Sequence, residues 1–194
     1  MTESFEARLF AAVELPANVR WRLAAWGREV ADSLGSARSP SGLRVLDRDS
    51  LHLTLSFLGS RPAEDIGELA EALGDACEGA PELELALGAP VWLPPRSPRA
   101  LAIEVREESG ALASLKRAVE QALSAERSGG RRFRPHVTVA RTRAGYRPPP
   151  GLQMPVTPAV GFEAATVALI RSWLEPQGAR YEVQSSVTLG HFTA

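Results

Sequence analysis

The chain has 194 residues, 44% of them hydrophobic and 23% charged, which is the composition of an ordinary soluble globular protein. Its net charge of −1 excludes a protein that attracts nucleic acid by bulk positive charge, so a polyanionic partner needs a local patch. The single cysteine, Cys77, excludes a disulfide framework and a cysteine-based metal site. The N-terminal residues lack the regions of a secretory signal, and no apolar run approaches the ~20 residues of a membrane span. We therefore expect a cytoplasmic monomer with no membrane partner.

Hydrophobic periodicity predicts alternating strands and helices in the first half of the chain. Asn18 is the expected N-cap of the first helix, and Pro62 the expected start of the second. Cys77 falls on the buried face of that second helix, which favours a packing role. The expected elements are, in order, a strand over 8–15, a helix over 18–34, a short strand over 44–46, a turn over 47–50, a strand that carries His52, and a helix over 62–78.

The second half again has strands around a helical segment. The expected elements are strands over 83–93 and 99–106, a helix from Ser109 to about Glu126, a strand that carries His136, a proline-rich loop over 143–155, and strands over 162–174 and 181–189. We therefore expect an α+β fold with two pseudo-symmetric lobes, mainly antiparallel sheets, outer helices and a central cleft. Residues 1–194 would then form one bilobal domain, with both lobes sharing the cleft.

Each half carries the same short motif on one predicted strand. The motifs are His52-Leu53-Thr54-Leu55 and His136-Val137-Thr138-Val139. Successive side chains of a strand point to opposite faces, so His and Thr share one face of each strand. The apolar residues, with Phe57 in the first strand, point to the other face and into the core. Two such strands facing each other would place two imidazoles and two hydroxyls around one small ligand.

The residue types on that shared face limit the chemistry. Zinc sites use three or four ligands, and neither motif adds a Cys, Asp or Glu on the His/Thr face, so we expect no metal and no cofactor. A Gly-x-Ser-x-Gly elbow is absent from the chain. Paired general acid–base catalysis remains, because imidazoles titrate near neutral pH, and threonine hydroxyls suit phosphate oxygens.

At these residues the chain resembles the two-histidine phosphoesterase superfamily, and within it the RNA 2′,3′-cyclic phosphodiesterases, also called 2′-5′ RNA ligases. The resemblance extends over nearly the whole chain. The segments that carry it are 8–16 (RLFAAVELP), 51–59 (LHLTLSFLG), 133–141 (FRPHVTVAR) and 177–181 (QGARY).

The resemblance implies metal-free hydrolysis of 2′,3′-cyclic phosphates, on RNA ends or nucleotides, to 2′-phosphomonoesters. Carried over by position, His52 would donate a proton to the departing 3′ oxygen and His136 would accept one from water. Thr54 and Thr138 would hold phosphate oxygens. Arg141 would bind the phosphate, although its odd offset from His136 requires a strand end, twist or bulge to bring it to the same face.

Other interpretations stay open from the residues alone. The same motifs would serve an enzyme acting on another cyclic phosphate or on a 2′-5′ linked oligonucleotide, with ligation as the reverse reaction. A non-catalytic RNA- or nucleotide-binding module is the alternative outside enzymes. Three more features have no decisive pattern: His191 is expected in an exposed tail, the basic run Arg131-Arg132-x-Arg134 would steer RNA or be solvated, and Phe10 and Phe57 would pack in the core or stack a base.

Overall fold

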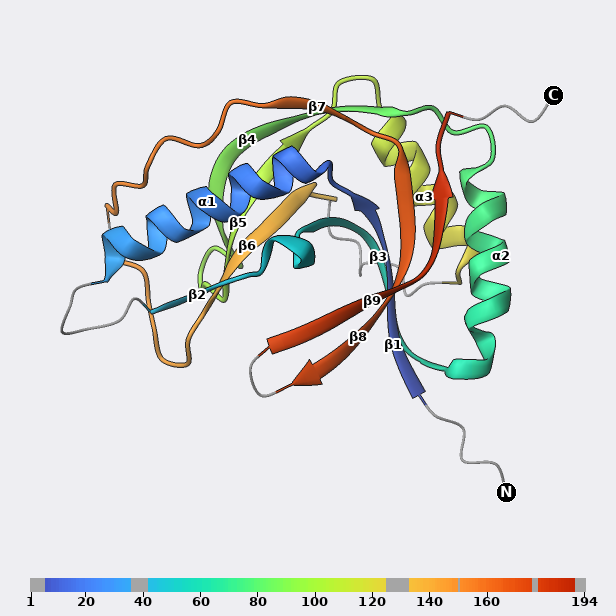
Figure 1. The fold of residues 1–194 in the computed structure, drawn as a ribbon, viewed down its shortest axis with the longest axis horizontal. Helices are drawn as coiled ribbons and strands as arrows, with labels where there is room; N and C mark the ends of the chain where they lie inside the picture. The colour runs from blue at the N-terminus through green and yellow to red at the C-terminus, as the bar shows by residue number, and fades with distance from the viewer. Residues whose placement is uncertain (1–5, 36–41, 125–132, 150, 176–177, 191–194) are drawn as a thin grey trace.

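The computed structural model describes residues 6–35, 42–124, 133–149, 151–175 and 178–190. In this part of the chain, a nine-stranded antiparallel sheet carries three α-helices, as expected for an α+β fold (Figure 1). The elements are β1 (Glu6–Glu14), α1 (Ala17–Leu34), β2 (Leu43–Val45), the 3₁₀ turn η1 (Arg48–Ser50), β3 (His52–Pro62), the 3₁₀ turn η2 (Ala63–Asp65), α2 (Ile66–Cys77), β4 (Leu83–Leu93), β5 (Ala100–Arg106), α3 (Ala111–Ala122), β6 (His136–Thr142), β7 (Gly161–Ala164), β8 (Thr166–Glu175) and β9 (Gly178–Thr188).

The strand order is β7-β4-β5-β6-β3-β1-β8-β9, and β2 pairs with β6 beside β3. The two motif strands, β3 and β6, are therefore neighbours at the middle of the sheet. Helix α1 packs against β2 and β6. Helices α2 and α3 pack against each other, α2 also against β8 and β9, and α3 also against β3. The two halves of the expected bilobal fold are thus continuous through one antiparallel pair, β3 with β6.

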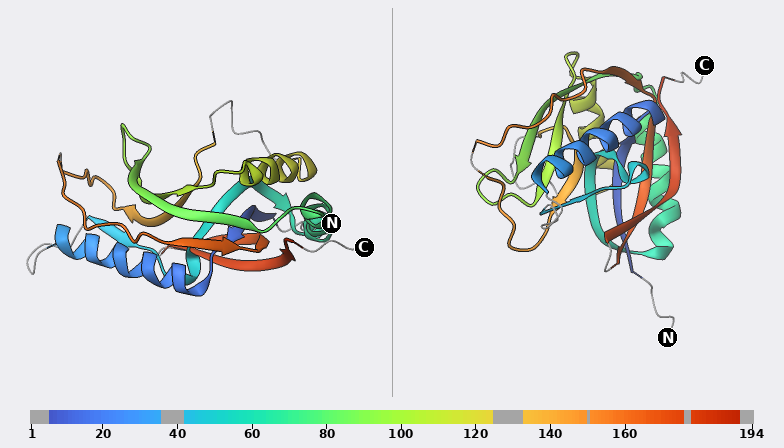
Figure 2. Two further views of the ribbon diagram at one scale, coloured as in Figure 1. Left: turned by 90° about the horizontal axis from the view of Figure 1, so that it is seen from above. Right: turned by 60° about the vertical axis from the view of Figure 1, so that its left-hand side comes forward.

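The sheet curls until its distant parts meet (Figure 2). The prediction of one strand over 162–174 is wrong, because the chain leaves the sheet at residue 165 and re-enters it elsewhere. β7 pairs with β4 at one end of the strand order, and β8 pairs with β1 near the other end. Since one residue separates β7 from β8, these two regions of the sheet must lie close together.

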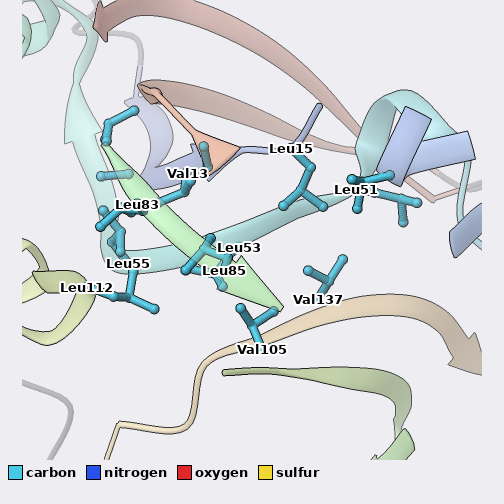
Figure 3. Packing of buried hydrophobic residues seen from close by; sticks show 14 of the residues in the cluster. Val13, Leu15, Leu51, Leu53, Leu55, Leu83, Leu85, Val105, Leu112 and Val137 are labelled. Atoms are coloured by element: carbon cyan, nitrogen blue, oxygen red, sulfur yellow. The ribbon is translucent and has the colours of Figure 1, made fainter. Parts of the chain in front are cut away.

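The apolar residues of both motifs lie in the main hydrophobic core, as predicted from strand alternation. Leu53, Leu55, Val137 and Val139 are all buried, and Figure 3 shows the first three among their neighbours. Complete burial of an aliphatic side chain stabilises a fold by about 1.5–3 kcal/mol. This burial fixes which face of each strand the histidines and threonines occupy.

Two helices begin differently from the prediction. Helix α1 has Pro16 at the N-cap position, and Asn18 lies inside the first turn, where its side chain accepts a hydrogen bond from the Val19 N–H (3.0 Å). Helix α3 begins at Ala111 rather than at Ser109, with Gly110 at the N-cap position. In front of it, the Glu107 carboxylate accepts hydrogen bonds from backbone N–H groups, including that of Gly110 (3.0 Å). Burial acts to raise the pKa of Glu107, but the hydrogen bonds from the Ser109 hydroxyl and from these N–H groups outweigh it and hold the pKa below its usual value.

Strand β3 also runs longer than expected. It continues to Pro62, and α2 starts only at Ile66, after η2. Cys77 is buried at the end of α2, and burial raises the pKa of its thiol to about 11, which suits the predicted packing role. No helix in the described ranges is both long and apolar enough to cross a membrane.

Helix α3 buries the only lysine of the sequence, Lys116, whose side chain forms an ion pair with Glu120 one turn later. The ammonium lies 5.1 Å from the ring centre of Phe133, a distance at which a cation is attracted to an aromatic face. Lys116 is only 8% exposed. The helix ends at Ala122, with Leu123 at its C-cap, so the predicted end near Glu126 is wrong by about one turn.

Candidate active site

Strand register brings the two motifs into direct opposition. Leu53 of β3 pairs with Val137 of β6 in an antiparallel ladder. Continued by one residue in each direction, this register sets His52 opposite Thr138 and Thr54 opposite His136. All four side chains are half-buried on one face of the sheet, which we call the motif face. Each histidine therefore lies beside the threonine of the other motif.

Both imidazoles are held by the same local hydrogen bond. His52 Nδ1 lies 2.8 Å from the Ser50 carbonyl oxygen, and His136 Nδ1 lies 2.7 Å from that of Arg134. A carbonyl oxygen only accepts, so Nδ1 carries the proton in each ring and Nε2 of the neutral form keeps a lone pair. Each Nε2 is thus the nitrogen available for proton transfer.

Arg141 reaches the motif face through a β-bulge. On the neighbouring strand β5, Ala102 pairs with Thr138 but Leu101 pairs with Ala140, so β6 has one extra residue at Val139. Such a bulge shifts the later side chains by one position, which cancels the odd offset between His136 and Arg141. The positive charge of Arg141 also lowers the pKa of the His52 imidazole, in addition to the larger effect of burial. The predicted set of five residues is therefore gathered at one place.

The first motif strand has a bulge at the equivalent position. On β1, Ala12 pairs with Thr54 and Ala11 pairs with Ser56, which leaves Leu55 as the extra residue of β3. Phe57 is thereby turned to the motif face, where it is 67% exposed with its ring centre 6.0 Å from that of Phe10. The prediction that Phe57 faces the core is wrong, whereas Phe10 is 4% exposed and does pack.

His52 is neutral at neutral pH in the free protein. Burial is the largest cause, and the positive charges of Arg141 and of protonated His136 add to it; together they lower the pKa of His52 from 6.5 to about 4. The hydrogen bond to the Ser50 carbonyl opposes this effect but is outweighed. A neutral imidazole can accept a proton but has none to donate from Nε2. The expected donor role therefore requires His52 to take up a proton when an anion binds.

Other predicted features are placed as follows. Arg134 does not extend freely from the strand but forms an ion pair with Glu104 (2.6 Å). Glu104 lies opposite His136 on β5, so this ion pair borders the second histidine. Arg131, Arg132, His191 and Gln177 lie outside the described residues.

A larger hollow elsewhere has the wrong charge for a phosphate. It measures about 1150 Å³ and lies between β4, β7 and the start of α3. Its lining includes five glutamates: Glu82, Glu84, Glu107, Glu108 and Glu163. By contrast, the pocket beside His52 is small, about 70 Å³. Since like charges repel, the motif face with Arg141 is the better place for a phosphate.

Comparison with known proteins identifies the family of the chain. The 2′-5′ RNA ligase superfamily matches residues 22–172. A Thermus thermophilus protein named RNA 2′,3′-cyclic phosphodiesterase is 34% identical over 194 residues, which cover 94% of this chain and 90% of that protein. An Escherichia coli K12 protein of the same name is 34% identical over 151 residues, covering 74% of this chain and 78% of its own.

Solved structures share the fold. A crystal structure of a Thermus thermophilus protein has a TM-score of 0.73 at 28% identity, covering 94% of this chain and 97% of that one. The structure of E. coli LigT complexed with 3′-AMP has a TM-score of 0.72 at 26% identity, covering 96% of this chain and 100% of that one. Motifs, fold and relatives agree with the resemblance seen in the sequence, and the chain belongs to the 2′-5′ RNA ligase superfamily.

Proposed function

We propose that this protein is an RNA 2′,3′-cyclic phosphodiesterase, which hydrolyses 2′,3′-cyclic phosphate ends to 2′-phosphomonoesters. The observation that carries the proposal is the opposed pair of motifs, with two imidazoles and two hydroxyls on one face beside Arg141. Relatives that are 30–34% identical carry this activity in their names. The substrates would be RNA ends and nucleoside 2′,3′-cyclic phosphates.

The proposed reaction needs one proton acceptor and one proton donor. His136 takes a proton from water, whose oxygen attacks phosphorus opposite the 3′ oxygen. The bond from phosphorus to the 3′ oxygen breaks, the bond to the 2′ oxygen stays, and His52 gives a proton to the departing 3′ oxygen. Exchange with solvent then restores both rings. Each proton transfer of this kind contributes roughly 10²–10⁴-fold to the rate.

Substrate binding would supply the proton that His52 lacks in the free protein. A cyclic phosphate carries a negative charge, and an adjacent negative charge favours the imidazolium form. It would therefore raise the pKa of His52, against the burial and positive charges that lower it beforehand. His52 would thus become a competent acid only in the complex.

Thr54, Thr138 and Arg141 would hold the phosphate. The two hydroxyls donate hydrogen bonds to non-bridging oxygens, and the guanidinium offers two parallel donors to the same group. The exposed ring of Phe57, at the position of β3 that corresponds to Arg141 in β6, offers a surface on which a terminal base would stack.

The mechanism assigns no step to a metal or cofactor. In the described ranges, no three His, Cys, Asp or Glu residues gather as a metal site. The test is to incubate the protein with EDTA and each 2′,3′-cyclic nucleotide, and to identify the product isomer by chromatography. A 2′-phosphate product formed in EDTA supports the proposal. A 3′-phosphate product, or activity that EDTA abolishes, contradicts the mechanism.

Two alternatives would give other results in that experiment. An enzyme for a different cyclic phosphate or a 2′-5′ linked oligonucleotide would show the same histidine dependence but prefer that compound. A non-catalytic RNA- or nucleotide-binding module would bind the nucleotides and leave them unchanged. Ligation through a 2′-5′ linkage would be the reverse of the proposed chemistry, and high concentrations of 5′-hydroxyl ends would reveal it.

We also propose that residues 1–194 act as one bilobal domain, as a monomer and in the cytoplasm. The sheet that continues from one half to the other through β3 and β6 supports a single folding unit. Light scattering during gel filtration would measure the mass, and a single unfolding transition followed by two probes would support one domain.

A further inference from the structure

The two motifs agree in register and hydrogen bonding, but their surroundings differ. The ring centre of His52 lies 4.7 Å from that of Phe10 and 5.2 Å from that of Tyr181, the latter at an interplanar angle of 86°. His136 instead lies across the ladder from Glu104, which pairs with Arg134. One histidine is therefore enclosed by aromatic rings and the other is bordered by an ion pair.

Tyr181 comes from a strand that does not pair with the strand of His52. Strands β1 and β8 lie between β9 and β3 in the sheet. The tyrosine packs on a small apolar cluster separate from the main core, which contains Phe10, Ala12, Ala168 and Ile170. Because the two alanines have short side chains, they leave room for the tyrosine ring to extend over the sheet to His52.

We propose that Tyr181 is a positioning residue for His52: the tyrosine ring, perpendicular to the imidazole, and the ring of Phe10 together fix the imidazole and keep water from it. Phe10 covers the imidazole at an interplanar angle of 33°, and the two aromatic rings meet edge-on at 78°, an arrangement favoured by ring quadrupoles. With the Ser50 carbonyl on Nδ1, the imidazole is held from three directions. The effect of Tyr181 on catalysis rests on the proposed function, whereas its effect on the position of the His52 imidazole does not.

The aromatic contacts act on His52 together with charged groups from several elements. His136 and Arg141 on β6 both lower the pKa of His52, after burial as the largest cause. Tyr181 adds no charge and would act through burial. The other charged residues nearby are Glu14 of β1, which pairs with His52 in the ladder, and Arg20 of α1 and Asp49 of η1, which line the same small pocket as Tyr181.

The experiment compares Tyr181→Leu with Tyr181→Phe, and uses Glu182→Gln as a control. Glu182 is the next residue of β9, so its side chain points to the opposite face of the strand, and its ladder neighbour on β8 is Arg171. NMR titration of the imidazole nitrogens would give the pKa and tautomer of His52 in the free protein. In Tyr181→Leu we expect this pKa to move up toward 6.5, and kcat to fall about tenfold with KM within twofold, because a small misplacement of a reacting group is costly.

Tyr181→Phe keeps the ring, so it should match the parent in all three measurements, as should Glu182→Gln. If Tyr181→Leu melts early, Tyr181→Met is measured in its place, because the unbranched methionine side chain is of similar size and adapts more easily to the gap. An unchanged pKa and tautomer of His52 without the ring would overturn the proposal. So would equal effects of the Leu and Phe variants, which would assign the role to the hydroxyl. An inactive parent protein would refute the proposed function but leave the NMR test intact.

Discussion

Replacing His52 with Gln should remove a pH-dependent part of the folding free energy. The pKa of His52 is about 4 in the folded protein and about 6.5 in the unfolded chain. A group whose pKa is lower in the folded state makes stability fall as pH decreases through that interval, because the unfolded chain binds the proton first. This contribution is complete above pH 6.5 and is lost by pH 4. From these two pKa values the loss is about 2 kcal/mol by pH 5, and about 3 kcal/mol at the acid end.

Urea unfolding of parent and His52→Gln at several pH values from 7.5 to 4 would measure this effect. The difference in unfolding free energy between the two proteins should decrease as the pH falls, while titrating groups that do not interact with His52 cancel in the comparison. Gln184→Ala, a change in β9 that removes no titrating group, should keep a constant difference from the parent. A constant difference for His52→Gln as well would mean that His52 titrates alike in both states, and the argument from burial would fail.

Four further predictions concern catalysis and substrate binding. Replacement of either His52 or His136 with Ala should lower kcat by at least ~10²-fold, because each removes a proton-transfer group, and retained turnover in steady-state assays would contradict the mechanism. Thr54→Val and Thr138→Val should each lower activity by about 10²–10³-fold while thermal melting stays near the parent value, since valine keeps the branched shape of threonine. Arg141→Lys should weaken phosphate binding, because the planar fork of the guanidinium is lost. Phosphate inhibition of that variant equal to that of the parent would mean that Arg141 is a surface residue with no role in binding. Phe57→Ala should raise KM for cyclic nucleotides by about tenfold or more without affecting stability, as base stacking contributes about 1–3 kcal/mol, whereas an equal KM would show that no base lies on this ring.

The strands and the motif pair were predictable because their signals are local. Alternation of apolar residues places β3 and β6, and the burial of Leu53 and Val137 then decides the face of each histidine. Spacing alone would not have sufficed, since His191-Phe192-Thr193 repeats the His-x-Thr pattern at the end of the chain. The apolar strands that surround the first two motifs distinguish them from the third.

The features that alternation cannot predict are those in which the strand departs from regularity. The bulges at Leu55 and Val139 have no marker residue such as glycine, so the exposed side of Phe57 was predicted wrongly. The strand change at residue 165 leaves the apolar pattern of 162–174 unbroken. Tyr181 is distant from His52 in sequence, and only the curl of the sheet brings their rings together.

The burial of Lys116 has a practical consequence for chemical labelling. Because the sequence contains no other lysine, amine-directed reagents find no exposed side-chain amine on the folded protein. Coupling at Lys116 would require α3 to separate locally from its contacts with Glu120 and Phe133 or to lift from the core, an event with its own free energy. The rate of acylation of Lys116, followed by mass spectrometry, would therefore report how often that helix opens in the otherwise native protein.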